Sequence, residues 1–105
     1  MANKEYIYML KKTYYRDARP YQDEDESEGT VLYKSFDKAV EVIQNEYNKK
    51  INHPDLEMKG IEIDKDNGRA SAFITIQTYK STYSVFTQYT WELSREEIKW
   101  TSKIL

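Results

Sequence analysis

The chain has 105 residues, of which 39% are hydrophobic and 32% charged, with a formal net charge of −2 and no cysteine. This length predicts a single domain over residues 1–105, large enough for one modest hydrophobic core. The lack of cysteine excludes disulfides, thiolate metal sites and cysteine nucleophiles, and a net charge near zero argues against a general nucleic-acid coat protein.

The sequence predicts neither a membrane-spanning segment nor a secretory signal. No apolar run approaches the roughly 20 residues that a membrane span needs. The first residues, Met1–Tyr6, lack the apolar stretch of a signal peptide. We therefore expect a soluble protein of the cytoplasm that makes no contact with a membrane.

The first predicted element is a strand over Glu5–Tyr15, which is rich in aromatic and other apolar residues. Both of its faces carry apolar side chains, with Tyr6 and Leu10 on one and Ile7 and Met9 on the other. We expect this strand to lie centrally in a sheet or to be covered on both sides.

Residues 16–30 are predicted to form a mobile acidic loop. The segment contains Pro20 and Gly29, and five of the six residues from Asp23 to Glu28 are carboxylates. Carboxylates so close together repel one another and cannot be buried unpaired, so they must face water or a cationic partner. The next residues, Thr30–Lys34, predict either a short strand or the approach to a helix.

A helix is predicted from Ser35 to about Lys50. Ser35 is a suitable N-cap, and Asp37 lies in the first turn, where the helix dipole favours an acid. Apolar residues then follow at helical spacing. They are Phe36, Val40, Ile43 and Tyr47.

Three strands are predicted next, over residues 58–64, 69–79 and 83–93, joined by turns at 66–68 and 80–82. In the second of them Ala70, Ala72, Ile74 and Ile76 alternate with more polar residues, which is typical of an antiparallel meander. We expect its other face, which carries Phe73, to pack against the N-terminal strand or a second helix.

That second helix is predicted from Ser94 to the end of the chain. Ser94 and Glu97 have the spacing of a capping box, and Leu93 and Ile98 hold the positions of a hydrophobic staple. The predicted fold is therefore α+β: an antiparallel sheet formed by the N-terminal strand and the three-strand meander, with two helices, in the order β-(β)-α-β-β-β-α.

The acidic run does not complete a calcium loop. Asp23, Asp25 and Ser27 match the first three ligand positions, but Glu28 replaces the required glycine and Lys34 the bidentate glutamate. We expect no metal site and no cofactor.

No catalytic residues are predicted. The single histidine lies in a predicted loop after the helix, and no serine occupies a nucleophile-elbow setting. The three glycines are isolated, so no glycine-rich loop can hold a phosphate. We therefore expect a protein without enzymatic activity.

The remaining features favour a surface that binds a protein or ribonucleoprotein partner. Carboxylates accelerate association with basic surfaces, while tyrosine and arginine are frequent anchors at interfaces. The acidic and basic groups either meet one partner together or pair within the molecule, and an edge strand could also join two chains as a homodimer. The predicted partner-binding residues are Asp23, Glu24, Asp25, Glu26, Glu28, Tyr21, Lys11, Lys12, Arg16 and Arg19.

Direct nucleic-acid binding is the alternative function. The predicted helix, three strands and helix follow the order found in double-stranded-RNA-binding domains, but Glu96 and Glu97 would repel phosphates at the start of the second helix. Exposed aromatic residues could instead stack single-stranded bases beside the basic N-terminal strand.

In composition the chain resembles small inhibitor proteins of phages and mobile elements, anti-CRISPR proteins among them. The acidic run Asp23–Glu28, the ten tyrosines and the single cysteine-free domain carry this resemblance. It implies stoichiometric inhibition, in the host cytoplasm, by covering a basic nucleic-acid-binding surface of the target.

Overall fold

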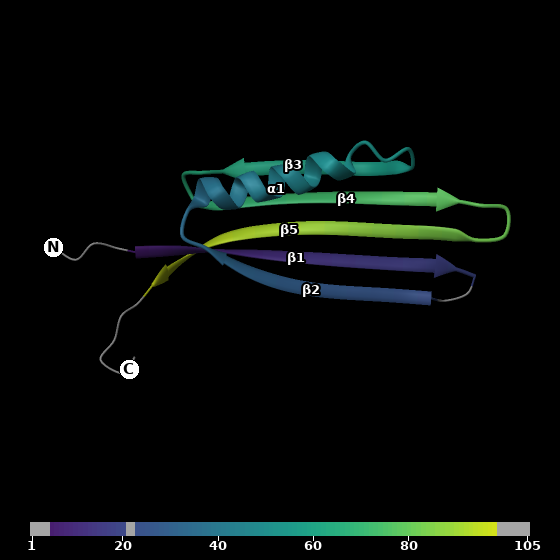
Figure 1. Ribbon diagram of the computed structural model, residues 1–105, viewed down its shortest axis with the longest axis horizontal. Helices are drawn as coiled ribbons and strands as arrows, with labels where there is room; N and C mark the ends of the chain where they lie inside the picture. Colours follow the sequence, from purple (N-terminus) through teal and green to yellow (C-terminus); the bar gives the residue numbers. More distant parts are fainter. Residues whose placement is uncertain (1–4, 21–22, 99–105) are drawn as a thin grey trace.

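The protein is a five-stranded antiparallel sheet with one helix on it, as the computed structural model shows for residues 5–20 and 23–98. The strand order across the sheet is β2-β1-β5-β4-β3 (Figure 1). The α+β class and the antiparallel sheet agree with the sequence prediction, whereas the number of strands and helices does not. The elements are β1 (Glu5–Arg19), β2 (Asp23–Tyr33), α1 (Phe36–Lys50), β3 (Leu56–Asp64), β4 (Arg69–Tyr79) and β5 (Ser84–Ile98).

The N-terminal strand β1 lies inside the sheet, between β2 and β5, as its two apolar faces predict. It extends four residues beyond the predicted end at Tyr15, to Arg19. β1 and β5 pair along their whole lengths, from Glu5 opposite Ile98 to Arg19 opposite Ser84. Because each has 15 residues, this central pair is about 50 Å long.

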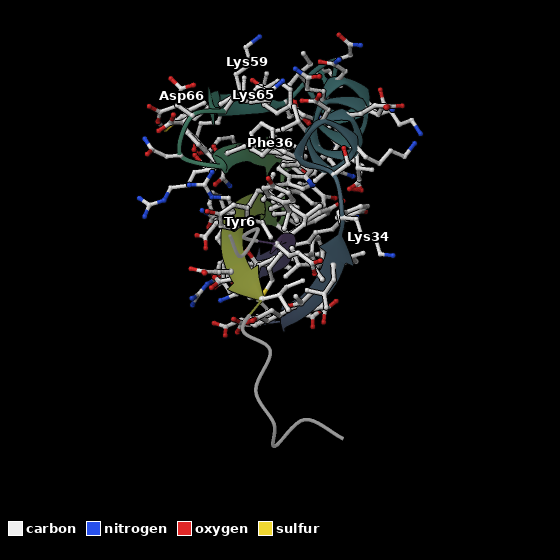
Figure 2. The ribbon with its side chains drawn as sticks, turned by 90° about the vertical axis from the view of Figure 1, so that its left-hand side faces the viewer. Tyr6, Lys34, Phe36, Lys59, Lys65 and Asp66 are labelled. Atoms are coloured by element: carbon white, nitrogen blue, oxygen red, sulfur yellow. The ribbon has the colours of Figure 1, made fainter. Side chains whose placement is uncertain are left out.

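The helix α1 packs on one face of the sheet and forms the core with it (Figure 2). Its buried residues are Phe36, Ala39, Ile43 and Tyr47, which contact alternate residues of the central strands. Leu10, Ile43 and Ile74 are completely enclosed. The strand residues of this core are Leu10, Ala70, Ala72, Ile74, Ile76, Trp91 and Leu93.

The boundaries of α1 follow local sequence signals, and the prediction from Ser35 to Lys50 is confirmed. The Ser35 side chain accepts a hydrogen bond of 3.2 Å from the backbone N–H of Lys38, which is the N-cap interaction. The turn between β3 and β4 is confirmed as well: Gly68 has a φ of 63°, a conformation that only glycine adopts without strain.

The prediction of a loop over residues 16–30 is wrong. Residues 16–19 belong to β1, and Asp23–Tyr33 form β2, which pairs with β1 without any shift in register. Local composition predicted a loop because packed carboxylates disfavour regular structure by themselves. The partner strand overrides this preference, since it supplies backbone hydrogen bonds and places basic side chains next to the acids.

The prediction of a second helix starting at Ser94 is wrong for the described part of that segment. Ser94–Ile98 continue β5 and pair with Glu5–Met9 of β1. The Ser94 hydroxyl donates to Glu96 at 3.3 Å, and Arg95 lies over the ring of Tyr6 at 4.6 Å. A helix here would leave the first third of β1 unpaired on this side, so the long-range pairing outweighs the capping box. The rest of the predicted helix, including Trp100, Ile104 and Leu105, lies outside the described residues.

The two serines allow a direct test of these assignments. Ser35→Ala should lower the free energy of unfolding by about 1 kcal/mol because it removes a helix cap. Ser94→Ala should change it by less than about 0.5 kcal/mol because a partly exposed strand residue has no cap to lose. Urea unfolding followed by circular dichroism measures both, and a larger loss for Ser94→Ala would contradict the strand assignment.

Candidate partner-binding surface

The acidic run forms most of an exposed edge of the sheet. β2 pairs only with β1, so its other side is the border of the described sheet. Residues 23–32 are all exposed. Because side chains alternate along a strand, Asp23 and Asp25 lie on the face that carries α1, and Glu24, Glu26 and Glu28 lie on the opposite, open face.

Three of the predicted basic residues pair with this acidic edge. Lys11 Nζ lies 3.3 Å from Glu28 Oε1, and Arg16 Nη1 lies 3.5 Å from Asp23 Oδ2. Arg19 Nη2 lies 3.8 Å from Glu24 Oε1. Of the two arrangements that the sequence left open, the molecule therefore adopts pairing of the acidic and basic groups within itself.

These ion pairs leave the edge available to other cations. The paired side chains are 35% to 68% exposed, and exposed pairs contribute only about 0–1 kcal/mol each. Asp25 and Glu26 form no ion pair within residues 5–20 and 23–98. The edge therefore keeps unneutralised charge at its centre and only weakly held charge on either side.

Lys12 has a different role from the other three basic residues. It lies on the helix face, where its Nζ is 2.7 Å from Oε1 and 3.0 Å from Oε2 of Glu46 on α1. The same carboxylate accepts a hydrogen bond of 3.3 Å from the indole N–H of Trp91. Lys12 thus helps to fix the helix on the sheet and does not belong to the acidic edge.

A second cluster on the open face adjoins the acidic edge, and of its residues only Arg19 was predicted from the sequence to bind a partner. Arg19 Nε donates to Asp17 at 2.9 Å, and this hydrogen bond, followed by the charge of Asp17, raises the pKa of Arg19. Desolvation by neighbouring groups, and then the charges of Asp17 and Glu24, raise the pKa of Tyr15 above 10.0. Strand alternation in β1 would have placed Tyr15, Asp17 and Arg19 together if residues 16–19 had been predicted as extended.

The open face of the sheet as a whole is acidic. By the strand register, nine carboxylates and three basic side chains lie on this face, compared with three carboxylates and four basic side chains of the strands on the helix face. The nine are Glu5, Asp17, Glu24, Glu26, Glu28, Glu62, Asp64, Glu92 and Glu96, and the three are Lys11, Arg19 and Arg69. The sheet therefore separates charge between its two sides.

The expectation that the aromatic face of the meander is covered is wrong for the described residues. Phe73, Phe86 and Tyr79 lie on the open face, and no segment within residues 5–20 and 23–98 packs over it (Figure 2). The N-terminal strand joins the sheet edgewise instead of crossing it. Phe86 contacts Tyr15, with ring centroids 6.2 Å apart, whereas Tyr79 is 77% exposed.

The helix face has a patch of aromatic and basic residues beyond the end of α1. With 15 residues the helix spans only about 22 Å of the strands. Past it, the rings of Tyr14 and Tyr89 lie 5.3 Å apart, and Lys50 Nζ lies 4.1 Å above the Tyr89 ring. Burial raises the pKa of the Tyr89 phenol. A shallow hollow of about 410 Å³ opens between this patch and Gly29.

The remaining residues and sites considered from the sequence lie as follows. Tyr21 is outside the described residues. His53 follows α1, and its Nδ1 accepts a hydrogen bond of 3.0 Å from the N–H of Asp55. In the described ranges, no three histidine or carboxylate side chains gather where they could hold a metal ion. No helix in the same ranges is long and apolar enough to cross a membrane.

Comparisons of the chain with protein-family models, curated proteins and solved structures find no match. The candidate site consists of an exposed acidic edge and an acidic open face, with a smaller aromatic and basic patch on the opposite side.

The contacts of Glu46 predict that it stabilises the fold. Glu46→Ala should lower the free energy of unfolding by about 1–3 kcal/mol, because it leaves Lys12 and the Trp91 indole N–H without their acceptor. The matched control on the same helix is Glu41→Ala, which removes an exposed ion pair with Lys38 at 3.8 Å; it should cost less than about 0.5 kcal/mol. Tryptophan fluorescence during urea unfolding reports both values, and equal losses would contradict the role of Glu46.

Proposed function

We propose that this protein is a non-enzymatic inhibitor or regulator that occludes a basic, nucleic-acid-binding surface of a macromolecular partner, in the manner of anti-defence proteins such as anti-CRISPR proteins. The acidic edge β2 and the adjoining open face form the contact surface. The observation that carries the proposal is the extended conformation of the acidic run, because it turns a cluster of charges into a line of charges.

The spacing along that line is close to that of a nucleic acid strand. Residues in an antiparallel strand rise by about 3.4 Å, so the five carboxylates of residues 23–28 provide nearly one negative charge per residue step. One strand of duplex DNA carries one phosphate charge per about 3.4 Å of helix axis. A surface that binds a phosphate backbone would therefore meet a similar linear density of charge.

The open face widens this contact beyond one strand. Its remaining carboxylates extend across the sheet as far as Glu62 and Asp64 on the opposite edge strand. A flat surface with an excess of one charge attracts an oppositely charged partner and accelerates their association at low salt. The separation of charge between the two faces also orients the molecule as it approaches.

The internal ion pairs are compatible with this role. Lys11, Arg16 and Arg19 hold their acidic partners in exposed pairs, which a cationic partner can replace at little cost in free energy. In the free protein these pairs limit the repulsion between carboxylates that would otherwise destabilise β2. The same basic residues thus stabilise the strand while its acidic groups remain accessible.

Neutralising the centre of the edge should weaken partner binding. The triple variant Asp25→Asn, Glu26→Gln, Glu28→Gln removes the two unpaired carboxylates and one weakly paired carboxylate. We expect roughly tenfold or greater loss of affinity at low salt and a flatter dependence of affinity on salt, with the fold unchanged. The partner is first captured from host-cell lysate with the unaltered protein, and its affinity is then measured by calorimetry at two salt concentrations.

The matched control is Glu41→Gln, Asp66→Asn, Glu97→Gln, which changes the net charge equally but lies away from β2 and the open face. It should bind almost as the unaltered protein does. In addition, a DNA or RNA oligonucleotide should displace the captured partner. Equal affinities of the two triple variants, or a partner that nucleic acid does not displace, would refute the proposal.

Direct nucleic-acid binding is the second candidate, favoured by the aromatic patch on the helix face. Tyr14 and Tyr89 could stack bases, and Lys50 could contact a phosphate. However, Asp25 on β2 and Glu46 on α1 lie on the same side of the sheet and would repel the phosphates. The charges therefore favour the first proposal.

A titration with labelled single-stranded and double-stranded oligonucleotides at two salt concentrations separates the two functions. We expect no salt-sensitive binding by the unaltered protein. Salt-sensitive binding that Tyr14→Leu weakens, and that Tyr79→Leu on the open face leaves unchanged, would instead establish the patch as a nucleic-acid site.

A further inference from the structure

The two border strands of the sheet differ in how they are protected against pairing with another strand. β3 has a register irregularity between Leu56 and Met58, and Gly60 and Lys59 in its middle; bulges, glycine and lysine are all features that discourage edge pairing. Within its described pairing β2 has no bulge, lysine or proline, and its eleven residues are paired with β1 in unbroken register. It does contain Gly29, between its acidic and its apolar half, so charge is the main protection of this edge.

The outer edge of β2 presents unpaired backbone groups. In an antiparallel ladder, alternate residues of an edge strand point their N–H and C=O groups outward, away from their neighbour. Since β2 lies at the end of the strand order, these outward groups have no partner strand within residues 5–20 and 23–98. Such an edge is the template used when an extended peptide joins a sheet.

The two halves of this edge differ in chemistry. The first half, from Asp23 to Glu28, is acidic. The second half carries Val31 and Leu32, which are 42% and 58% exposed although they are aliphatic residues in a border strand. Their side chains point to opposite faces of the sheet, so contact with the helix side cannot cover both. Acidic charge alone does not explain these exposed aliphatic groups, whereas a strand beside β2 would cover them.

We infer that β2 is the docking edge for an extended segment of the partner, which joins the sheet as an additional antiparallel strand. Running antiparallel to β2, the segment has apolar residues first, opposite Leu32 and Val31, and lysine or arginine residues afterwards, opposite Glu28 to Asp23. Backbone hydrogen bonds provide the pairing, and the order of apolar and basic residues fixes direction and register. This inference rests on the proposed function and specifies how the partner is held.

A second copy of this chain fits the same edge poorly. Two antiparallel β2 strands in full overlap would place Glu28 opposite Glu28 and Val31 opposite Asp25. The second strand would bring its own carboxylates to the interface and would add no cationic side chain. Charged groups opposite aliphatic groups gain no cross-strand stabilisation, and like charges opposite each other are destabilising. The charge on the edge therefore disfavours self-association and admits a cationic strand.

The experiment uses synthetic peptides as long as β2. The parent peptide is Thr-Val-Val-Thr-Thr-Lys-Thr-Lys-Lys-Lys-Lys, with both ends capped, so that its valines and lysines fall opposite the apolar and acidic halves. Two control peptides keep the composition: one has alternate backbone nitrogens methylated, and the other has the sequence reversed. Both controls retain the charge of the parent peptide. The methylated peptide cannot donate backbone N–H hydrogen bonds along one edge, and the reversed peptide has its basic residues before its apolar residues.

We expect the parent peptide to bind in a salt-sensitive manner and to slow hydrogen exchange of alternate amides in β2. The methylated and reversed peptides should bind at least about tenfold more weakly, because they lose edge hydrogen bonds or register. In the protein, Val31→Thr, Leu32→Thr should weaken binding of the parent peptide. The matched pair on the opposite border, Ile61→Thr, Ile63→Thr, should not, although those isoleucines are also exposed.

Failure of this inference can be told apart from failure of the proposed function. If the parent and methylated peptides bind equally, or if protection appears in β3 and not in β2, strand addition is refuted while electrostatic occlusion stands. Sedimentation that shows the protein dimerising through β2, with loss of peptide binding, would also refute it by assigning the edge to a second copy. If no basic peptide binds and the acidic triple variant captures its partner unchanged, both proposals fail.

Discussion

The pairing of β2 with β1 is the interaction on which the rest of the structure depends. It holds an acidic segment extended along a strand that carries Lys11, Arg16 and Arg19, so that three exposed ion pairs offset repulsion among the carboxylates. Without this pairing β1 would itself become a border strand, and the carboxylates would lose their fixed spacing. The stability of the edge and its proposed function therefore share one cause. Pairing with β1 holds the acidic run in an extended conformation, and the same pairing leaves its side chains exposed to solvent.

One-sided packing explains the character of the two faces. The helix α1 buries the small and aliphatic residues of the central strands, with Ile43 and Ile74 completely enclosed. The opposite face receives no cover from the described residues, so it can be polar, and it holds most of the carboxylates of the strands. Because α1 is much shorter than β1 and β5, the helix face also has an uncovered part, where Tyr14, Tyr89 and Lys50 gather. The two candidate surfaces thus follow from the same mismatch between a long sheet and a short helix.

The candidate site could be predicted in part from the sequence. The acidic run and the basic residues of the N-terminal strand were recognised by their composition. Which acidic residue pairs with which basic residue was not predicted. The pairing of Arg16 with Asp23 and of Lys11 with Glu28 depends on a hairpin that local composition disfavours. Tyr15, at the end of the predicted strand, and Asp17 were missed because residues 16–19 were predicted as a loop, in which the alternation of side chains does not continue. Lys12 was grouped with its neighbours because charge alone cannot show that its side chain points to Glu46.

The sequence by itself determined the elements whose signals are local. The cap at Ser35, the helical spacing from Phe36 to Tyr47, the Gly68 turn and the alternation in β4 require only neighbouring residues, and all appear where predicted. Tertiary structure decided the two segments in which distant pairing competes with local preference. Asp23–Glu28 became a strand and Ser94–Ile98 did not become a helix, because both lie beside β1 and its backbone hydrogen bonds are available only to an extended chain. Those hydrogen bonds join residues up to about 90 positions apart, a distance over which no local pattern carries information.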